Sequence, residues 1–181
     1  GRQSTEHIKI DDRTDGHAGI DIRILDGTKG ETCHIPVIIT KSGVEETVYN
    51  DFYIGEDADV TIVAGCGVHN CDCEDSHHNG IHRFFLAKNS KVLYLEKHYG
   101  EGDGSGKRII NPETEVFAEE GSTMEMNTVQ IKGVDSTKRV SKAELKDGAK
   151  LVITEKIMTH GDQTAETSFD VIMSGQDSSC H

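Results

Sequence analysis

The stretch Ala58-Asp59-Val60-Thr61-Ile62 decides the fold of this chain, because its pattern returns three times along the sequence. A small residue follows a polar turn, and a strand of alternating apolar residues follows the small residue. The pattern begins again at Ser90–Tyr94, Ser122–Met126 and Ala149–Ile153, in steps of 32, 32 and 27 residues. A repeat of this length indicates stacked structural units that each contact their neighbours along the chain.

Each repeat also holds a second, weaker strand, and no window of twelve residues shows helical periodicity. The second strands are predicted at His82–Leu86, Thr114–Phe117 and Thr137–Leu145. Two strands and two turns per repeat favour an all-β parallel β-helix, also called a β-solenoid. The alternative is an antiparallel β-sandwich or barrel, whose strands also recur about every ten residues. We expect the β-helix to occupy residues 32–181, with residues 1–31 as an N-terminal extension or a first irregular coil.

The composition suits a thin core and limits the possible partners. Hydrophobic residues make up 34% of the 181 residues, and there is no Trp. A net charge of −13 argues against nucleic acid as a partner, since phosphates bind basic surfaces. No run of eighteen apolar residues predicts a membrane span. Five cysteines, three of them crowded together, favour reduced thiols and a cytoplasmic location.

The crowded cysteines lie in Cys66–His82, which holds three of the five cysteines and four of the ten histidines. We expect this segment to be a long loop between a strand ending at Ala64 and one starting near Ile81. Thiolates and imidazoles are ligands for zinc, iron and copper(I). The candidate metal ligands are Cys71, Cys73, His78, His82, Cys66 and His77.

Two cysteines and two histidines of this set would suit a tetrahedral zinc or cluster-like site, namely Cys71, Cys73, His78 and His82. The spacing fits no named zinc finger, however. The alternative is that Cys66 and Cys71 are small buried residues and that the histidines are solvated. His98, on the next strand, would add a ligand from the neighbouring coil or else bind water at a strand end.

The glycine-rich stretch Gly100–Arg108 invites a phosphate-binding interpretation. A phosphate-binding loop has Gly five residues before its Gly-Lys pair and a hydroxyl residue after the Lys. Here Glu101 holds the first position, and Arg108 follows Lys107. We therefore expect a turn at the end of a coil.

Five runs together resemble one known family, although each alone is a weak signal. They are Ile62–Cys71, Gly80–His82, Glu96–Gly100, Asn111–Thr114 and Ile131–Arg139. Their combination is similar to the SufB/SufD family of the SUF iron–sulfur cluster assembly system, in particular to its short prokaryotic members.

The resemblance extends over residues 32–180 and implies a right-handed parallel β-helix. It implies a scaffold without enzymatic turnover, which holds a transient iron–sulfur cluster. Zinc or iron is expected only from the ligand chemistry of the Cys66–His82 segment. The implied partners are a SufC-like ABC ATPase, a SufB/SufD-like subunit or a second copy of this chain, and a cysteine desulfurase as the sulfur source. Family members continue beyond the segment that His181 ends, and their cluster-assembly residues lie there. None of those residues is therefore assigned to a position here, and the chain resembles a truncated member.

Two other functions fit the same sequence. One is a β-solenoid metal-binding protein or metalloenzyme that uses the Cys66–His82 segment around an open coordination site. The other is a structural or carbohydrate-binding β-helix. The latter would need exposed aromatic platforms, which this Trp-free chain mostly lacks.

Overall fold

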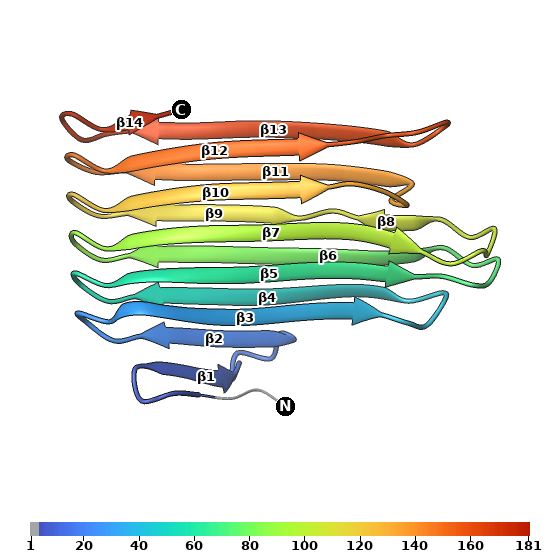
Figure 1. The fold of residues 1–181 in the computed structure, drawn as a ribbon, viewed down its shortest axis with the longest axis horizontal. Helices are drawn as coiled ribbons and strands as arrows, with labels where there is room; N and C mark the ends of the chain where they lie inside the picture. Colours follow the sequence, from blue (N-terminus) through green and yellow to red (C-terminus); the bar gives the residue numbers. More distant parts are fainter. Residues whose placement is uncertain (1–3) are drawn as a thin grey trace.

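A computed structural model describes residues 4–181, in which the chain forms fourteen strands and no helix. The strands build a parallel β-solenoid of about five turns. Figure 1 shows the coils stacked from the N-terminal end to the C-terminal end, with the turns gathered along two sides. The predicted all-β parallel β-helix is therefore confirmed.

The strands alternate between two sheets as the chain winds around the solenoid. Their bounds are β1 Ile8–Asp12, β2 Gly19–Ile24, β3 Lys29–Ile39, β4 Glu45–Ile54, β5 Asp59–His69, β6 Ser76–Leu86, β7 Lys91–Glu101, β8 Arg108–Ile110, β9 Glu113–Ala118, β10 Thr123–Gln130, β11 Ser136–Leu145, β12 Lys150–Ile157, β13 Thr164–Met173 and β14 Ser179–Cys180.

One sheet has the order β1-β2-β4-β6-β8-β11-β13, with β9 between β6 and β11, and the other has the order β3-β5-β7-β10-β12-β14. All pairs are parallel except β1 with β2, which is antiparallel. Strand β2 pairs in parallel with β4, so that Ile22 lies beside Phe52. The parallel stack therefore begins at Gly19, within the stretch expected to be an N-terminal extension or a first irregular coil.

The sequence repeat corresponds to the register of the second sheet. Val60 pairs with Val92, Val92 with Met124, and Met124 with Leu151. All four side chains are buried. One coil therefore contributes one residue to each column of the core, which explains the steps of 32, 32 and 27 residues.

The turn before each repeat contains a residue in the left-handed backbone region, followed by a small buried residue. The φ angle is +55° at Asp57 and +56° at Asn89, and Asp and Asn tolerate the left-handed region. At other turns a glycine adopts this conformation. The small residues at the equivalent positions are Thr28, Ala58, Ser90, Ser122 and Ala149. Because adjacent turns stack on one another, only small side chains fit there.

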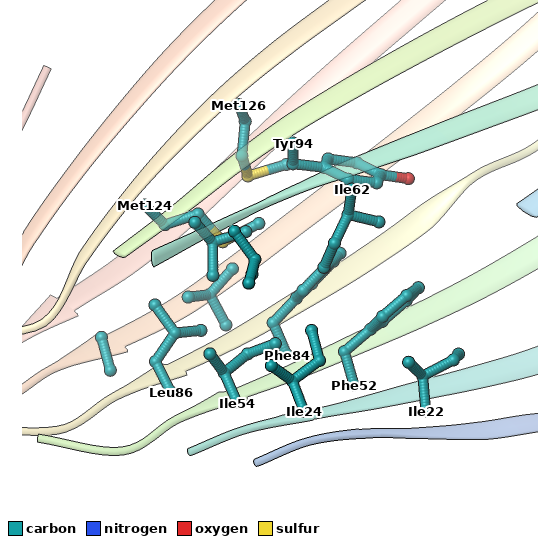
Figure 2. Packing of buried hydrophobic residues seen from close by; sticks show 14 of the residues in the cluster. Ile22, Ile24, Phe52, Ile54, Ile62, Phe84, Leu86, Tyr94, Met124 and Met126 are labelled. Carbon is teal, nitrogen blue, oxygen red and sulfur yellow. The ribbon is translucent and has the colours of Figure 1, made fainter. Parts of the chain in front are cut away.

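The interior contains a large apolar cluster at one end of the strands and a small one at the other. The large cluster includes stacked rings of Phe52 and Phe84, whose centroids are 4.5 Å apart (Figure 2). The small cluster is formed by Ile39, Val68, Ile110 and Val134. Polar side chains fill the space between the two clusters, which accounts for the low apolar content.

The prediction of a long loop between Ala64 and Ile81 is wrong. Strand β5 continues to His69 and β6 starts at Ser76, so the connection is confined to residues 70–75. Gly65, Gly67 and the polar residues at the start of β6 hide the apolar alternation. The strand register nevertheless continues through them, because the neighbouring coils supply complete hydrogen-bonding edges.

Candidate functional site

A network of buried polar and charged side chains lies between the two sheets and forms the candidate site. Its members are Cys66 on β5, His78 and His82 on β6, Tyr94, Glu96 and His98 on β7, and Arg139 on β11, each less than 5% exposed. Buried ionisable groups are costly unless they are paired, so their concentration here calls for a specific arrangement.

Strand geometry explains why these residues meet. Successive side chains of a strand point to opposite faces, so Tyr94, Glu96 and His98 all face the interior. On β6, His78 and His82 flank Gly80 on the inner face. A Cβ atom at Gly80 would lie 3.3 Å from Nε2 of His78 and 3.5 Å from Nε2 of His82. The glycine therefore leaves space for both imidazoles.

One branch of the network is a chain of thiol, imidazole and carboxylate. Sγ of Cys66 lies 3.3 Å from Nε2 of His78, and Nδ1 of His78 lies 3.2 Å from Oε2 of Glu46. Because a carboxylate accepts, Nδ1 carries the ring proton and Nε2 can accept the proton of the thiol. The three groups come from β5, β6 and β4, and Glu46 pairs in register with His78.

Burial sets the protonation of this branch. Burial raises the pKa of the Cys66 thiol, and the negative charge of Glu96 adds to that effect. Burial also lowers the pKa of His78, although Glu46 opposes the change. Both groups are therefore neutral at pH 7. His78 is a base placed to take the Cys66 proton when that sulfur bonds to a cation or to another atom.

A second branch passes from Asn50 to Glu96. Nδ2 of Asn50 donates to Nε2 of His82 at 3.2 Å, Nδ1 of His82 donates to the Tyr94 hydroxyl at 2.6 Å, and that hydroxyl donates to Oε1 of Glu96 at 2.9 Å. Figure 2 shows the Tyr94 hydroxyl at the edge of the apolar cluster. Burial lowers the pKa of His82 to about 4, so its ring is neutral at pH 7.

Arg139 closes the network from the next coils. Its Nη1 donates to Oε2 of Glu96 at 2.9 Å, its Nη2 donates to Nδ1 of His98 at 2.9 Å, and its Nε lies 3.3 Å from Oε1 of Glu155. Burial alone would raise the pKa of Glu96, but His98, Arg139 and His82 together hold it well below the usual value. Glu96 is therefore a carboxylate that neutralises the guanidinium.

His98 retains an unsatisfied nitrogen in this arrangement. Because Nδ1 accepts from Arg139, the ring proton lies on Nε2. That atom is 3.3 Å from Oε1 of Glu96 but lacks the alignment of a hydrogen bond. Cys66 and His98 are register neighbours on adjacent coils. His98 therefore faces the network, as expected for a residue contributed by the next coil, and does not bind solvent at a strand end.

A cavity of about 700 Å³ lies at the N-terminal end of the solenoid, between β3 and the strands β1, β2 and β4. Its walls include Val37, Glu46 and Asn50. Val37 pairs in register with Cys66, while Glu46 and Asn50 bond to His78 and His82. The cavity therefore ends against residues that contact the network directly.

The structure divides the predicted metal ligands into two groups. Cys66, His78 and His82 belong to the buried network, whereas Cys71 and Cys73 are exposed on the turn between β5 and β6. His77 is half-buried on the outer face of β6. The expected tetrahedral set therefore does not form, because β6 directs His78 and His82 inward and the turn directs both thiols outward.

No group of three or more His, Cys, Asp or Glu side chains within residues 4–181 is arranged to hold a metal ion. Within the same described residues, two thiol–imidazole pairs occur instead, Cys66 with His78 and Cys71 with His69. The Cys66–His82 segment therefore supplies parts of two separate sites and no complete ligand set of its own.

Sequence reasoning missed Glu46, Tyr94, Glu96 and Arg139 as members of the network. The alternation of β7 contained a signal, because Tyr94 and Glu96 share the inward face with Val92. Arg139 could not be placed in this way. A fully buried arginine is rare, and its partner Glu96 lies 43 residues away in sequence.

No helix within the described part of the chain could span a membrane. Comparison with known proteins finds no matching family model, curated protein or solved structure.

Proposed function

We propose that this chain is a scaffold of the SufB/SufD type for iron–sulfur cluster assembly. The observation that carries the proposal is the chain of Cys66, His78 and Glu46 inside a parallel β-helix. A thiol with a base at 3.3 Å can release its proton as sulfur or iron binds, and the carboxylate holds the base in the required tautomer. A rigid stack of coils keeps these groups in place.

The positions of the motif residues support the proposal. All five runs that resemble the family place a buried side chain in the interior of the solenoid. Their buried polar and thiol side chains include Cys66, His82, Glu96, His98, Thr114 and Arg139. His82, Glu96, His98 and Arg139 lie in the branch around Glu96, and Cys66 bonds to His78 in the other branch. Four of the five runs therefore contribute to one buried cluster, which is the pattern expected of a shared site.

The cluster is cargo in this proposal, and the chain supplies only part of its ligands. A soft thiol and imidazoles suit iron, but residues 4–181 hold no preformed group of three ligands. A SufB/SufD-like partner subunit or a second copy of the chain therefore completes the ligand set. A SufC-like ABC ATPase and a cysteine desulfurase act with the scaffold in the cytoplasm, and the scaffold itself turns over no substrate.

Anaerobic reconstitution tests the role of the Cys66 thiol. The purified chain is incubated with ferrous iron, cysteine and a cysteine desulfurase, and then desalted and assayed for iron and acid-labile sulfide. Cys33 provides a matched control, because it is equally buried but packs in the apolar cluster. We expect the wild type and Cys33→Ser to retain iron and sulfide, and Cys66→Ser to lose most of both.

Two results would overturn the proposal. One is a wild-type chain that, tested both alone and together with a SufB/SufD-like partner subunit, retains no more iron and sulfide than the same chain unfolded in denaturant. The other is a Cys66→Ser chain that keeps the full wild-type amounts. Circular dichroism of each variant verifies that the β-fold is intact.

A further inference from the structure

The turn between β5 and β6 carries two thiols that the buried network does not use. Cys71 and Cys73 are both free and exposed. Sγ of Cys71 lies 3.1 Å from Nε2 of His69, which is also exposed at the end of β5. An accessible thiol beside an imidazole nitrogen, with a second thiol two residues away, is an arrangement suited to sulfur exchange.

Asn70 holds the backbone of this turn. The side chain of Asn70 is fully buried, and its Oδ1 accepts from the Ser42 hydroxyl at 2.7 Å and from the Asp72 N–H at 3.0 Å. Its Nδ2 donates to the Glu74 carbonyl at 2.7 Å. One buried amide therefore fixes both ends of the segment that contains the two thiols.

The glycine-rich turn of the next coil packs against the same backbone. The N–H of Gly104 donates to the Asn70 carbonyl at 3.2 Å, and that of Gly106 donates to the Asp72 carbonyl at 2.9 Å. A Cβ atom at Gly104 would lie 2.4 Å from the Asp72 backbone. The glycines thus allow close backbone stacking on one side, and the cysteine side chains remain exposed.

The spacing of the two cysteines is compatible with a bond between them. Two trans peptide units span at most about 7.6 Å between Cα atoms, and a disulfide requires about 4.4–6.8 Å. The chain bends at residues 72–74, which shortens the span below its extended value. Cys71 and Cys73 can therefore be joined within the turn, without moving β5 or β6.

We propose that Cys71 and Cys73 form a thiol–disulfide exchange site for low-molecular-weight disulfides, with His69 as the base for Cys71. The Cys71 proton passes to His69, and the thiolate attacks one sulfur of the disulfide. The S–S bond of the substrate breaks, and the departing thiolate takes the proton from His69. A mixed disulfide with Cys71 remains.

Cys73 then completes the exchange. Its sulfur attacks the Cys71 sulfur, the mixed disulfide breaks, and the second small thiol leaves with the Cys73 proton. The two cysteines together lose two electrons and two protons, and the disulfide substrate is reduced to two thiols. The site uses no residue of the buried network, so its failure would leave the scaffold proposal intact.

Oxidised glutathione is the probe for the test. The reduced, desalted full chain is incubated with it under anaerobic conditions, and intact mass and peptide mapping follow the products. We expect the wild type to lose two hydrogen masses through a link between residues 71 and 73. Cys73→Ser should instead accumulate a glutathione adduct at Cys71, a product that a merely structural role would not yield.

His69→Gln supplies the matched test of the base. It should slow adduct formation at Cys71 roughly tenfold in the Cys73→Ser background, and leave the rate of any reaction at the half-buried Cys180 unchanged. The proposal is overturned if no 71–73 link forms in the wild type, or if the Cys71 adduct forms equally fast with and without His69.

Discussion

Arg139 lies fully enclosed between the two sheets, where a guanidinium ion loses its water shell. Glu96 supplies the opposite charge at 2.9 Å, and His98 supplies a second acceptor at the same distance. Removing one partner of such a pair leaves an uncompensated charge in a region of low dielectric. The free-energy cost of that unpaired charge is larger than the net stabilisation that the intact pair provides.

Arg139→Met should therefore lower the free energy of unfolding by about 3–5 kcal/mol. Glu96→Gln in the same chain should recover part of the loss, because the unpaired carboxylate is then removed. The control is Lys138→Met on the exposed face, whose nearest carboxylate, Glu166, is 4.0 Å away. That change should cost less than about 0.5 kcal/mol. Urea denaturation measures all three variants. Equal losses for Arg139→Met and Lys138→Met would contradict the prediction.

His82 predicts a pH dependence of stability. Its pKa is about 4 in the folded chain and about 6.5 when unfolded, so the unfolded state binds more protons between these values. The contribution of His82 to the free energy of unfolding is fully present above pH 6.5 and is lost as the pH falls toward 4. Between pH 7 and pH 5, the wild type should lose about 2 kcal/mol more than His82→Gln. Denaturant titrations at the two pH values measure the difference, and parallel losses in both proteins would refute it.

Several features of the residue scale could be predicted from the sequence. The sequence marks Cys66 and His82 as parts of motifs and offers His98 as a residue from the next coil, but it predicts a loop where Cys66 and His82 face inward from strands. The pairing of Cys66 with His78 could not be predicted, because it depends on how far β5 and β6 extend beyond their apolar parts. The contact between Arg139 and Glu96 depends on side-chain packing across two coils.

At the scale of the elements, the turns are the most regular part of the chain. A left-handed residue precedes a small buried residue at each repeat, and the N–H of the left-handed residue bonds to a carbonyl of the next coil, as at Asn89 with Glu120 and Gly121 with Asp147. Turn conformation and coil stacking are therefore coupled.

This coupling can be tested with two glycines. Gly148 has a φ of +63°, and a Cβ there would be 3.9 Å from the nearest atoms, in the Gly121 backbone, so Gly148→Ala adds backbone strain without a steric clash and should cost about 1 kcal/mol. Gly65 lies outward on β5 with no positive φ, and a Cβ there would be 3.8 Å from its nearest atom. Gly65→Ala should leave stability unchanged or raise it by up to about 1 kcal/mol. Thermal unfolding of both variants measures the change in stability. An equal loss of stability in both would exclude backbone strain as the cause.

The elements themselves were largely predictable. The strand predicted at Thr137–Leu145 lies in β11, and the glycine-rich stretch forms a turn at the end of a coil. The end of β5 and the start of β6 were not predictable, because glycines and polar residues interrupt the apolar alternation there. Those residues join the sheets because β3, β4 and β7 offer hydrogen-bonding edges to the same part of β5 and β6.

At the scale of the whole molecule, each coil contacts only its neighbours, so stability should vary along the stack. Strand β7 lies between β5 and β10, and every second side chain on it is buried. Strand β13 pairs with β11 alone, and nine of its ten residues are exposed. The centre of the stack is therefore held from both sides, whereas β13 is held from one.

Amide hydrogen exchange should reveal this gradient. Peptides from β13 should exchange well before those from β7, because opening β13 breaks one strand interface and exposes little apolar surface. Mass spectrometry of proteolytic peptides measures the order. Uniform protection of β7 and β13 would show that the solenoid opens as a single cooperative unit.

The sequence by itself favoured the solenoid over a β-sandwich, because a period-2 pattern that returns every 27 to 32 residues lets each coil bury its apolar side chains against the next. It also identified the segment Cys66–His82, where thiols and imidazoles gather. Only the tertiary structure decided which of those groups meet. The inward or outward direction of a side chain depends on strand register, and partners such as Cys66 and His78, or Glu96 and Arg139, come from different coils that only packing brings together.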